Sequence, residues 1–229
     1  MSAAPLKLIS SMATREVLAE LAAQYSRTHS HLVNTEAAGG VDVAKRVQAG
    51  EAVDIVVLAD NAIDKLIADG KLLGGRVDLV KSGIAIAVRE GAPRPDIGSE
   101  EAVKRAVLAA GSLSYSTGPS GVYLEKLFER WGILQDIRSR IIVPPPGIPV
   151  GTLVARGDCE LGFQQLSELV NLPGIAVLGP LPDSIQAITT FSGGIAANCT
   201  QLAAARALLN YMATPAAAAM KQRHGMQPA

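Results

Sequence analysis

The stretch Asp54-Ile55-Val56-Val57-Leu58-Ala59 decides the fold, because it is a continuous apolar run of strand length without polar alternation. Such a run is typical of a central strand that helices cover on both faces. Asp60 then starts a helical pattern that carries Ile63 and Leu66, and Gly70 ends it. A buried strand followed by a helix predicts one βα unit of an α/β protein.

Similar units occur on both sides of this stretch. We expect further strands at about residues 6–10, 32–36, 83–88, 112–116, 141–143 and 160–164, with amphipathic helices between them. The pattern predicts an α/β fold with mostly parallel sheets flanked by helices. An extended stretch from Arg76 to Ser82 would carry the chain into a second domain, and the alanine-rich final helices would return to the first. We therefore predict two lobes with two crossings, one lobe from 1–82 and 190–229 and the other from 83–189.

The composition excludes several function classes. The 229 residues include 21 Lys and Arg and 21 Asp and Glu, so no net charge attracts nucleic acid or an anionic membrane. No apolar run approaches the ~20 residues of a membrane span. The chain as given shows no signal peptide, so we expect it to be cytoplasmic, or periplasmic if a leader was removed. Cys159 and Cys199 lack metal-ligand spacing, and we expect no metal and no cofactor.

Four turns share small or hydroxyl residues where a strand ends and a helix begins: Ser10-Ser11, Gly39-Gly40, Ser116 to Gly121, and Gly147 to Gly151. The first amides of a helix attract anions, and in the third turn Ser116, Thr117 and Ser120 add hydroxyl donors. Helix capping by Ser10 or Ser11 explains any one turn alone. Four turns that face one cleft would instead surround a small anion.

Three further motifs stand out along the chain: Gly50-Glu51-Ala52-Val53-Asp54-Ile55-Val56 with Ala59-Asp60, then Gly157-Asp158-Cys159-Glu160-Leu161-Gly162-Phe163, and finally His224-Gly225-Met226. They resemble motifs of the molybdate-binding protein family, the class II periplasmic solute-binding proteins of ABC transporters. The resemblance covers nearly the whole chain and extends to an aconitate-isomerase-like branch. It implies a periplasmic-binding-protein-like II fold, with two α/β lobes, two hinge strands and a small-anion site in the cleft between the lobes.

The resemblance also implies ligand positions. Ser11 or Ser10 matches the first ligand serine, Ser120 with Gly121 the third ligand segment, and Val150 lies near the fourth. This chain departs from the family at two positions. Gly39 or Gly40 stands where the family has a second ligand serine, and Gln164 stands where it has a ligand tyrosine.

These departures favour an organic di- or tricarboxylate over molybdate. Gln164 and Gln165 offer amide groups, and Arg15 in the first helix adds a guanidinium that suits a planar carboxylate. The structural alternatives are that Arg15 faces solvent and that Gln164 makes a hydrogen bond at a strand end.

The sequence leaves binding and catalysis both open. One alternative is a cytoplasmic isomerase of an unsaturated tricarboxylate such as aconitate, which needs a single base for allylic proton transfer, with Glu36 or Tyr115 in that role. Another is a molybdate or tungstate transport component, with a permease as partner if the chain is exported. A ligand sensor is a third reading. Motifs for hydrolases, P-loop enzymes and dinucleotide-binding proteins are missing from the sequence.

Overall fold

The computed structural model describes residues 4–29, 31–145 and 147–229. The chain divides into two compact units, which are treated separately below. Unit 1 comprises Met1–Lys81 and Thr190–Ala229, and unit 2 comprises Ser82–Thr189. The chain leaves unit 1 within strand β4 (Val77–Arg89) and re-enters it within strand β8 (Ile188–Ile195).

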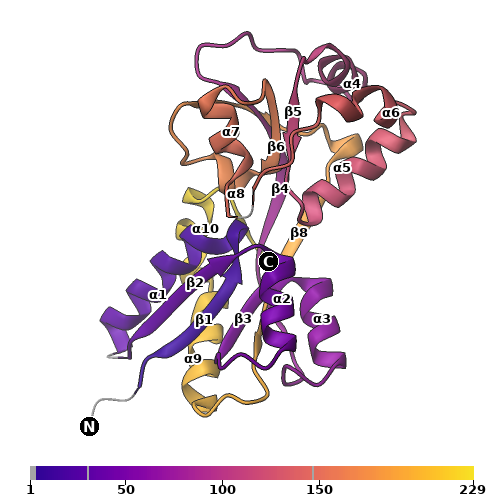
Figure 1. Cartoon of the computed structure of the whole chain (residues 1–229). Helices are drawn as coiled ribbons and strands as arrows, with labels where there is room; N and C mark the ends of the chain where they lie inside the picture. Colours follow the sequence, from indigo (N-terminus) through magenta and orange to yellow (C-terminus); the bar gives the residue numbers. More distant parts are fainter. Residues whose placement is uncertain (1–3, 30, 146) are drawn as a thin grey trace. The chain divides into compact units, whose positions relative to one another are not determined.

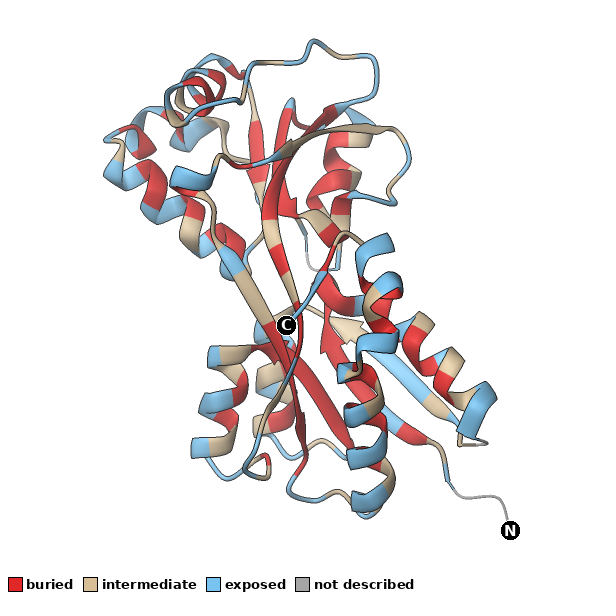
Figure 2. Cartoon of the chain, turned by 180° about the vertical axis from the view of Figure 1, so that it is seen from behind, coloured by how far each residue is buried: buried red, intermediate tan, exposed pale blue. Residues whose placement is uncertain are grey.

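Unit 1 contains a mixed sheet with helices on both faces (Figure 1). The strands β2 (Val33–Ala38), β1 (Leu6–Ser11) and β3 (Ile55–Ala59) are parallel, and β8 lies antiparallel to β3. One face packs on α1 (Arg15–His29), α9 (Leu202–Ala213) and α10 (Ala218–Arg223), and the other on α2 (Gly40–Gln48) and α3 (Asp60–Ala68). β3 is buried along its whole length, as its apolar sequence predicts (Figure 2).

The C-terminal segment of unit 1 packs against the first part of β4. Strand β9 (Gln227–Pro228) pairs with Val80 and Lys81 of β4. The Lys221 side chain of α10 is only 1% exposed, and its Nζ donates to the Leu79 carbonyl at 2.8 Å. Burial lowers the pKa of this ammonium, because the charged form loses its hydration.

Unit 2 has a second sheet. Its strands β5 (Leu113–Tyr115) and β6 (Leu161–Gln165) are parallel, and β4 lies antiparallel to β6 and to β7 (Ile175–Pro180). A larger core joins one face of this sheet to α4 (Glu100–Ala109), α5 (Pro119–Arg130) and α6 (Leu134–Ile137). The short helices α7 (Val150–Arg156) and α8 (Leu166–Leu169) pack on smaller apolar clusters. The 3₁₀ turns are η1 (Met12–Thr14), η2 (Arg138–Arg140), η3 (Asp183–Ile185) and η4 (Pro215–Ala217).

The predicted α/β class is confirmed, and two segments differ from the sequence-based expectation. The extended stretch before residue 83 is part of the long strand β4 and not a separate connection. The expected strand at 141–143 is reduced to a single bridge between Leu113 and Ile141. The prolines that begin at Pro144 have no N–H to donate, so they cannot extend a ladder from Ile141.

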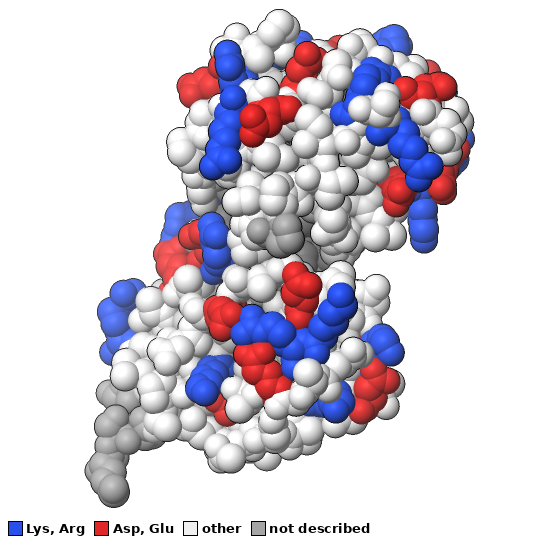
Figure 3. All heavy atoms as spheres, in the orientation of Figure 1, with Lys and Arg blue, Asp and Glu red and all other residues white. Residues whose placement is uncertain are grey.

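The surface charges are mixed in sign. Lys and Arg side chains lie beside Asp and Glu in several separate patches of the visible face, as the balanced composition predicts (Figure 3). Within the described ranges, no helix is long and apolar enough to cross a membrane.

Candidate functional site

In unit 1, the ends of β1 and β2 place an unused hydroxyl beside an uncapped helix. Ser11 is the last residue of β1 and precedes η1, but its hydroxyl makes no capping hydrogen bond. The side chain is 8% exposed, and Oγ has no partner among the described residues. Helix α2 starts after Gly39 with no side-chain cap, and a Cβ placed on Gly40 would lie 3.7 Å from the Ser11 Cβ. The Ser11 hydroxyl and the first amides of α2 thus remain available to an anion.

The other predicted residues of this turn have different surroundings. The Ser10 hydroxyl donates to the Ser11 carbonyl at 3.2 Å, so Ser11 alone of the two serines keeps an unused hydroxyl. The Arg15 guanidinium contacts Glu16, with Nε 2.8 Å from Oε1, and its side chain is 52% exposed. This is the solvent-facing arrangement that the sequence left open as the alternative to a ligand contact.

In unit 2, the hydroxyl-rich turn after β5 uses its hydrogen-bonding groups internally. The Ser116 and Ser120 hydroxyls lie 2.9 Å apart, and the Gly118 amide donates to Ser116 Oγ at 3.3 Å. Thr117 is exposed. Gly121 is required for packing, because a Cβ there would lie 1.5 Å from the Ser116 carbonyl oxygen. What the turn leaves open is the start of α5, which carries no side-chain cap.

The two adjacent glutamines of β6 point to opposite faces of the sheet. Gln164 accepts a hydrogen bond from the Gly151 amide at 3.2 Å and donates to Glu168 at 2.7 Å, so both ends of its amide are engaged. Val150, the first residue of α7, precedes Gly151 and is fully buried. Gln165 donates from Nε2 to Thr189 Oγ1 at 2.9 Å, while its Oε1 is buried and meets no partner within residues 4–29, 31–145 and 147–229.

Sequence reasoning did not single out Ser82 or Ser167, whose buried hydroxyls, like the Gln165 Oε1, are unpartnered among the described residues. Strand alternation separates Gln165 from Gln164, because Phe163 faces the larger core and Gln165 follows two residues later. No sequence signal marks Ser82, a single serine within a long strand. Leaving a buried polar group without a hydrogen bond costs about 1–3 kcal/mol, so such groups call for a ligand or water.

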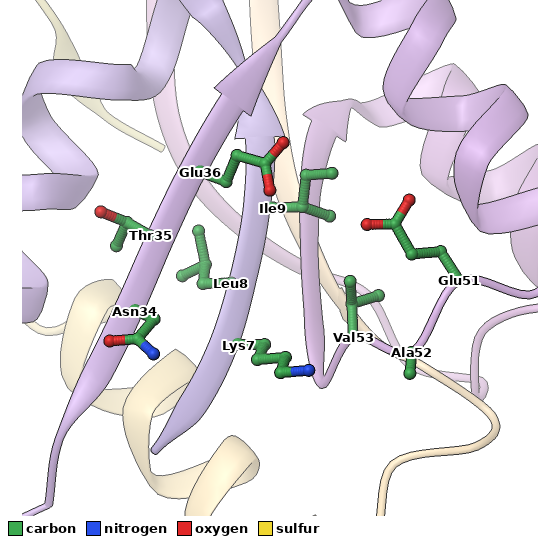
Figure 4. Close-up of a pocket in the computed structure, with 9 residues that line it drawn as sticks. All are labelled: Lys7, Leu8, Ile9, Asn34, Thr35, Glu36, Glu51, Ala52 and Val53. Atoms are coloured by element: carbon green, nitrogen blue, oxygen red, sulfur yellow. The ribbon is translucent and has the colours of Figure 1, made fainter.

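The two groups considered as bases are poorly suited to that role. Glu36 lines an open groove of about 400 Å³ over β1 and β2, together with Lys7, Asn34 and Glu51 (Figure 4). Its carboxylate lies 2.5 Å from Arg46, whose hydrogen bond lowers the pKa of Glu36. Tyr115 packs on Phe128, and burial raises the pKa of its phenol. At neutral pH, Glu36 is therefore a weak base and Tyr115 stays protonated.

Comparisons with known proteins agree with this architecture. Residues 6–227 match the model of a family described as bacterial extracellular solute-binding protein. The chain is similar over its full fold to the periplasmic molybdate-binding protein of Azotobacter vinelandii, with a TM-score of 0.80, 19% identity, and coverage of 96% of this chain and 98% of that one. It is also similar to the sulfate-binding protein of Mycobacterium tuberculosis, with a TM-score of 0.82, 15% identity, and coverage of 99% and 87%.

A relative in sequence is an aconitate isomerase of a Pseudomonas species. It is 43% identical over 190 residues, which cover 81% of this chain and 71% of the relative. The resemblance to molybdate-binding-type proteins that the motifs indicated is confirmed at the level of family and fold. The chain belongs to the family of bacterial extracellular solute-binding proteins.

Proposed function

We propose that this protein binds a small organic polycarboxylate, with an unsaturated tricarboxylate of the aconitate type as the first candidate. The observation that carries the proposal is the buried Ser11 hydroxyl, which has no partner among the described residues and lies beside the start of α2, where no side-chain cap is found. A hydroxyl and helix amides are neutral donors that a carboxylate oxygen can accept from without rearranging the fold.

The sequence relative and the Gly39-Gly40 turn both favour a carboxylate over molybdate or sulfate. The molybdate- and sulfate-binding neighbours share the fold at 19% and 15% identity, which carries no information on the ligand. The 43% identical relative is named for a tricarboxylate. Gly39-Gly40, where the resemblance implied a ligand serine, supplies amides but no hydroxyl, which leaves fewer donors for four tetrahedral oxygens.

Calorimetric titration tests this proposal. The purified chain would be titrated with cis-aconitate, trans-aconitate, citrate, molybdate and sulfate under one set of conditions. We expect heat from at least one of the tricarboxylates and none from molybdate or sulfate. Tight molybdate binding with silent tricarboxylates would overturn the proposal.

Isomerisation is a second candidate function, favoured by the 43% identity to an aconitate isomerase. The reaction removes a proton from the ligand's CH₂ group and returns one to its vinylic carbon, while the double bond shifts between them. It needs one base and donors that stabilise the delocalised charge, and it consumes no oxidant or reductant. Helix amides and the Ser11 hydroxyl would supply the donors, and we assign no base, given the surroundings of Glu36 and Tyr115.

Proton NMR in D₂O separates the two functions. An isomerase would interconvert cis- and trans-aconitate at catalytic protein concentrations and exchange the allylic protons for deuterium. Confirmed aconitate binding without turnover or exchange would assign the chain to binding alone.

A further inference from the structure

The Ser11 hydroxyl lies where strand β1 loses one of its two neighbouring strands. Ser10 pairs with β2 and, through Val57, with β3, and the ladder between β1 and β3 ends there. Ser11 is still paired with Ala38 of β2. The sheet therefore holds Ser11 on one side only, and its position depends on contacts from the turn that follows β1.

Thr14, the last residue of η1, supplies such a contact. Its side chain is 0% exposed, and its Oγ1 donates to the Ser11 carbonyl oxygen at 3.1 Å. The Ser10 hydroxyl reaches the same oxygen at 3.2 Å, but this bond joins two neighbours within one strand. The Thr14 bond instead ties the end of β1 to the helical segment that follows it.

A fixed Ser11 carbonyl limits where the Ser11 hydroxyl can point. Because the peptide bond is planar, the carbonyl direction sets ψ of Ser11, which is 155°. The ladder with β2 holds the other side of the same residue. Both sides fixed, the Ser11 Cβ points toward α2, where a Cβ placed on Gly40 would lie 3.7 Å away. Thr14 has no exposed surface, so it can act on a ligand only through Ser11.

We propose that Thr14 is a positioning residue for the Ser11 hydroxyl and strengthens carboxylate binding without touching the ligand. The inference rests on the proposed function, in which the Ser11 hydroxyl and the start of α2 bind a carboxylate oxygen. Every group that it invokes belongs to unit 1. A donor that is already oriented binds more tightly than one that must first be ordered, because that ordering costs entropy when the ligand binds.

The test is a double-mutant cycle between Thr14 and Ser11, with trans-aconitate titrated into the full chain by calorimetry. Thr14→Val removes the hydroxyl and keeps the branched shape, while the Ser11 carbonyl retains its bond from Ser10. We expect Thr14→Val to weaken binding about three- to tenfold, the range of one neutral hydrogen bond. Thr14→Ser restores the donor and should bind within about twofold of wild type. In a Ser11→Ala chain, Thr14→Val should change the affinity less than about twofold, because no hydroxyl is left to position.

Thr28→Val is the matched control, because it makes the same substitution in the same helical segment. The Thr28 Oγ1 also donates to a carbonyl three residues back, that of Tyr25, at 3.2 Å. At 1.5 Å per residue, Thr28 lies roughly 20 Å from Thr14 along α1. Thr28→Val should therefore bind trans-aconitate like wild type.

Equal affinity of Thr14→Val and wild type would overturn the positioning role. An equal loss in the Ser11→Ala chain would also overturn it, because a general structural role of Thr14 predicts that result. Both outcomes leave the proposed function intact. A Ser11→Ala chain with wild-type affinity would overturn the proposed function and this inference together. If Thr14→Val does not fold, Thr14→Ala also lacks the hydroxyl and takes its place in the same comparison.

Discussion

Two turns that look alike in sequence have different hydrogen bonding in the structure. The turn after β5 in unit 2 is the richer in hydroxyls, yet Ser116 and Ser120 bond each other. The turn after β1 in unit 1 has only two serines, and one of them, Ser11, is buried with no partner in the part of the chain that the structure describes. Hydroxyl density in sequence therefore does not show which hydroxyls are free to bind a ligand; the hydrogen bonding within the fold does.

Among the substitutions that test this contrast, Gly121→Ala is predicted to cause the largest loss of stability. The new Cβ would lie 1.5 Å from the Ser116 carbonyl oxygen, so the backbone of the unit 2 turn must move. Such overpacking costs about 3 kcal/mol, more than the ~1 kcal/mol that alanine gains over glycine in a helix. Urea unfolding followed by circular dichroism would measure the loss of free energy of unfolding.

Gly118→Ala is the control for that substitution. A Cβ at Gly118 would meet Ser116 Oγ at 3.6 Å, which is ordinary contact, and the backbone there is extended. Its stability should stay within about 0.5 kcal/mol of wild type. Equal losses in both variants would show that the close approach at Gly121 does not shape the turn.

A smaller loss of stability is predicted for Gln164→Leu. The substitution leaves the buried Gly151 amide at the start of α7 without its acceptor, and Glu168 loses a donor. The expected cost is about 1–3 kcal/mol in the free energy of unfolding, with no change in ligand affinity. A variant with native stability and weakened binding would contradict this prediction and would show that Gln164 contacts the ligand.

The smallest effect is predicted for Ser120→Ala. Its hydroxyl bonds Ser116, which is half-buried and can bond water instead. The unfolding free energy should fall by about 0.5–1.5 kcal/mol. Titration should find an affinity within about twofold of wild type, because the lost bond is internal to the turn. A tenfold weaker complex would show that the hydroxyl leaves Ser116 to bind the ligand.

Much of the fold could be predicted from sequence because it depends on local patterns. The apolar run at β3 and the helix that begins at Asp60 are found close to their predicted bounds. A strand was predicted at residues 141–143 because these residues are apolar, but the structure has only a single bridge at Ile141. The prolines that follow prevent a longer ladder. β8 runs antiparallel to β3, and β4 runs antiparallel to β6. These directions depend on how segments distant in sequence pair, which no local pattern encodes.

The site was less predictable, because sequence shows which residues can donate but not which ones already do. Ser10 and Ser11 are equivalent in sequence, and strand alternation with a nearby carbonyl separates them. Gln164 and Gln165 are separated in the same way by the faces of β6. The role of Arg15 could not be predicted because it depends on an ion pair with the neighbouring Glu16, which holds the Arg15 guanidinium at the surface.

The most direct test of the account is the affinity of Ser11→Ala for trans-aconitate, measured by calorimetry beside Ser10→Ala. We predict that Ser11→Ala keeps the wild-type unfolding free energy and binds about ten- to a hundredfold more weakly, as expected for a lost bond to a charged oxygen. Ser10→Ala, whose hydroxyl is bonded within the chain, should bind like wild type. Equal affinity of Ser11→Ala and wild type would contradict the claim that unused hydrogen-bonding groups mark the ligand site.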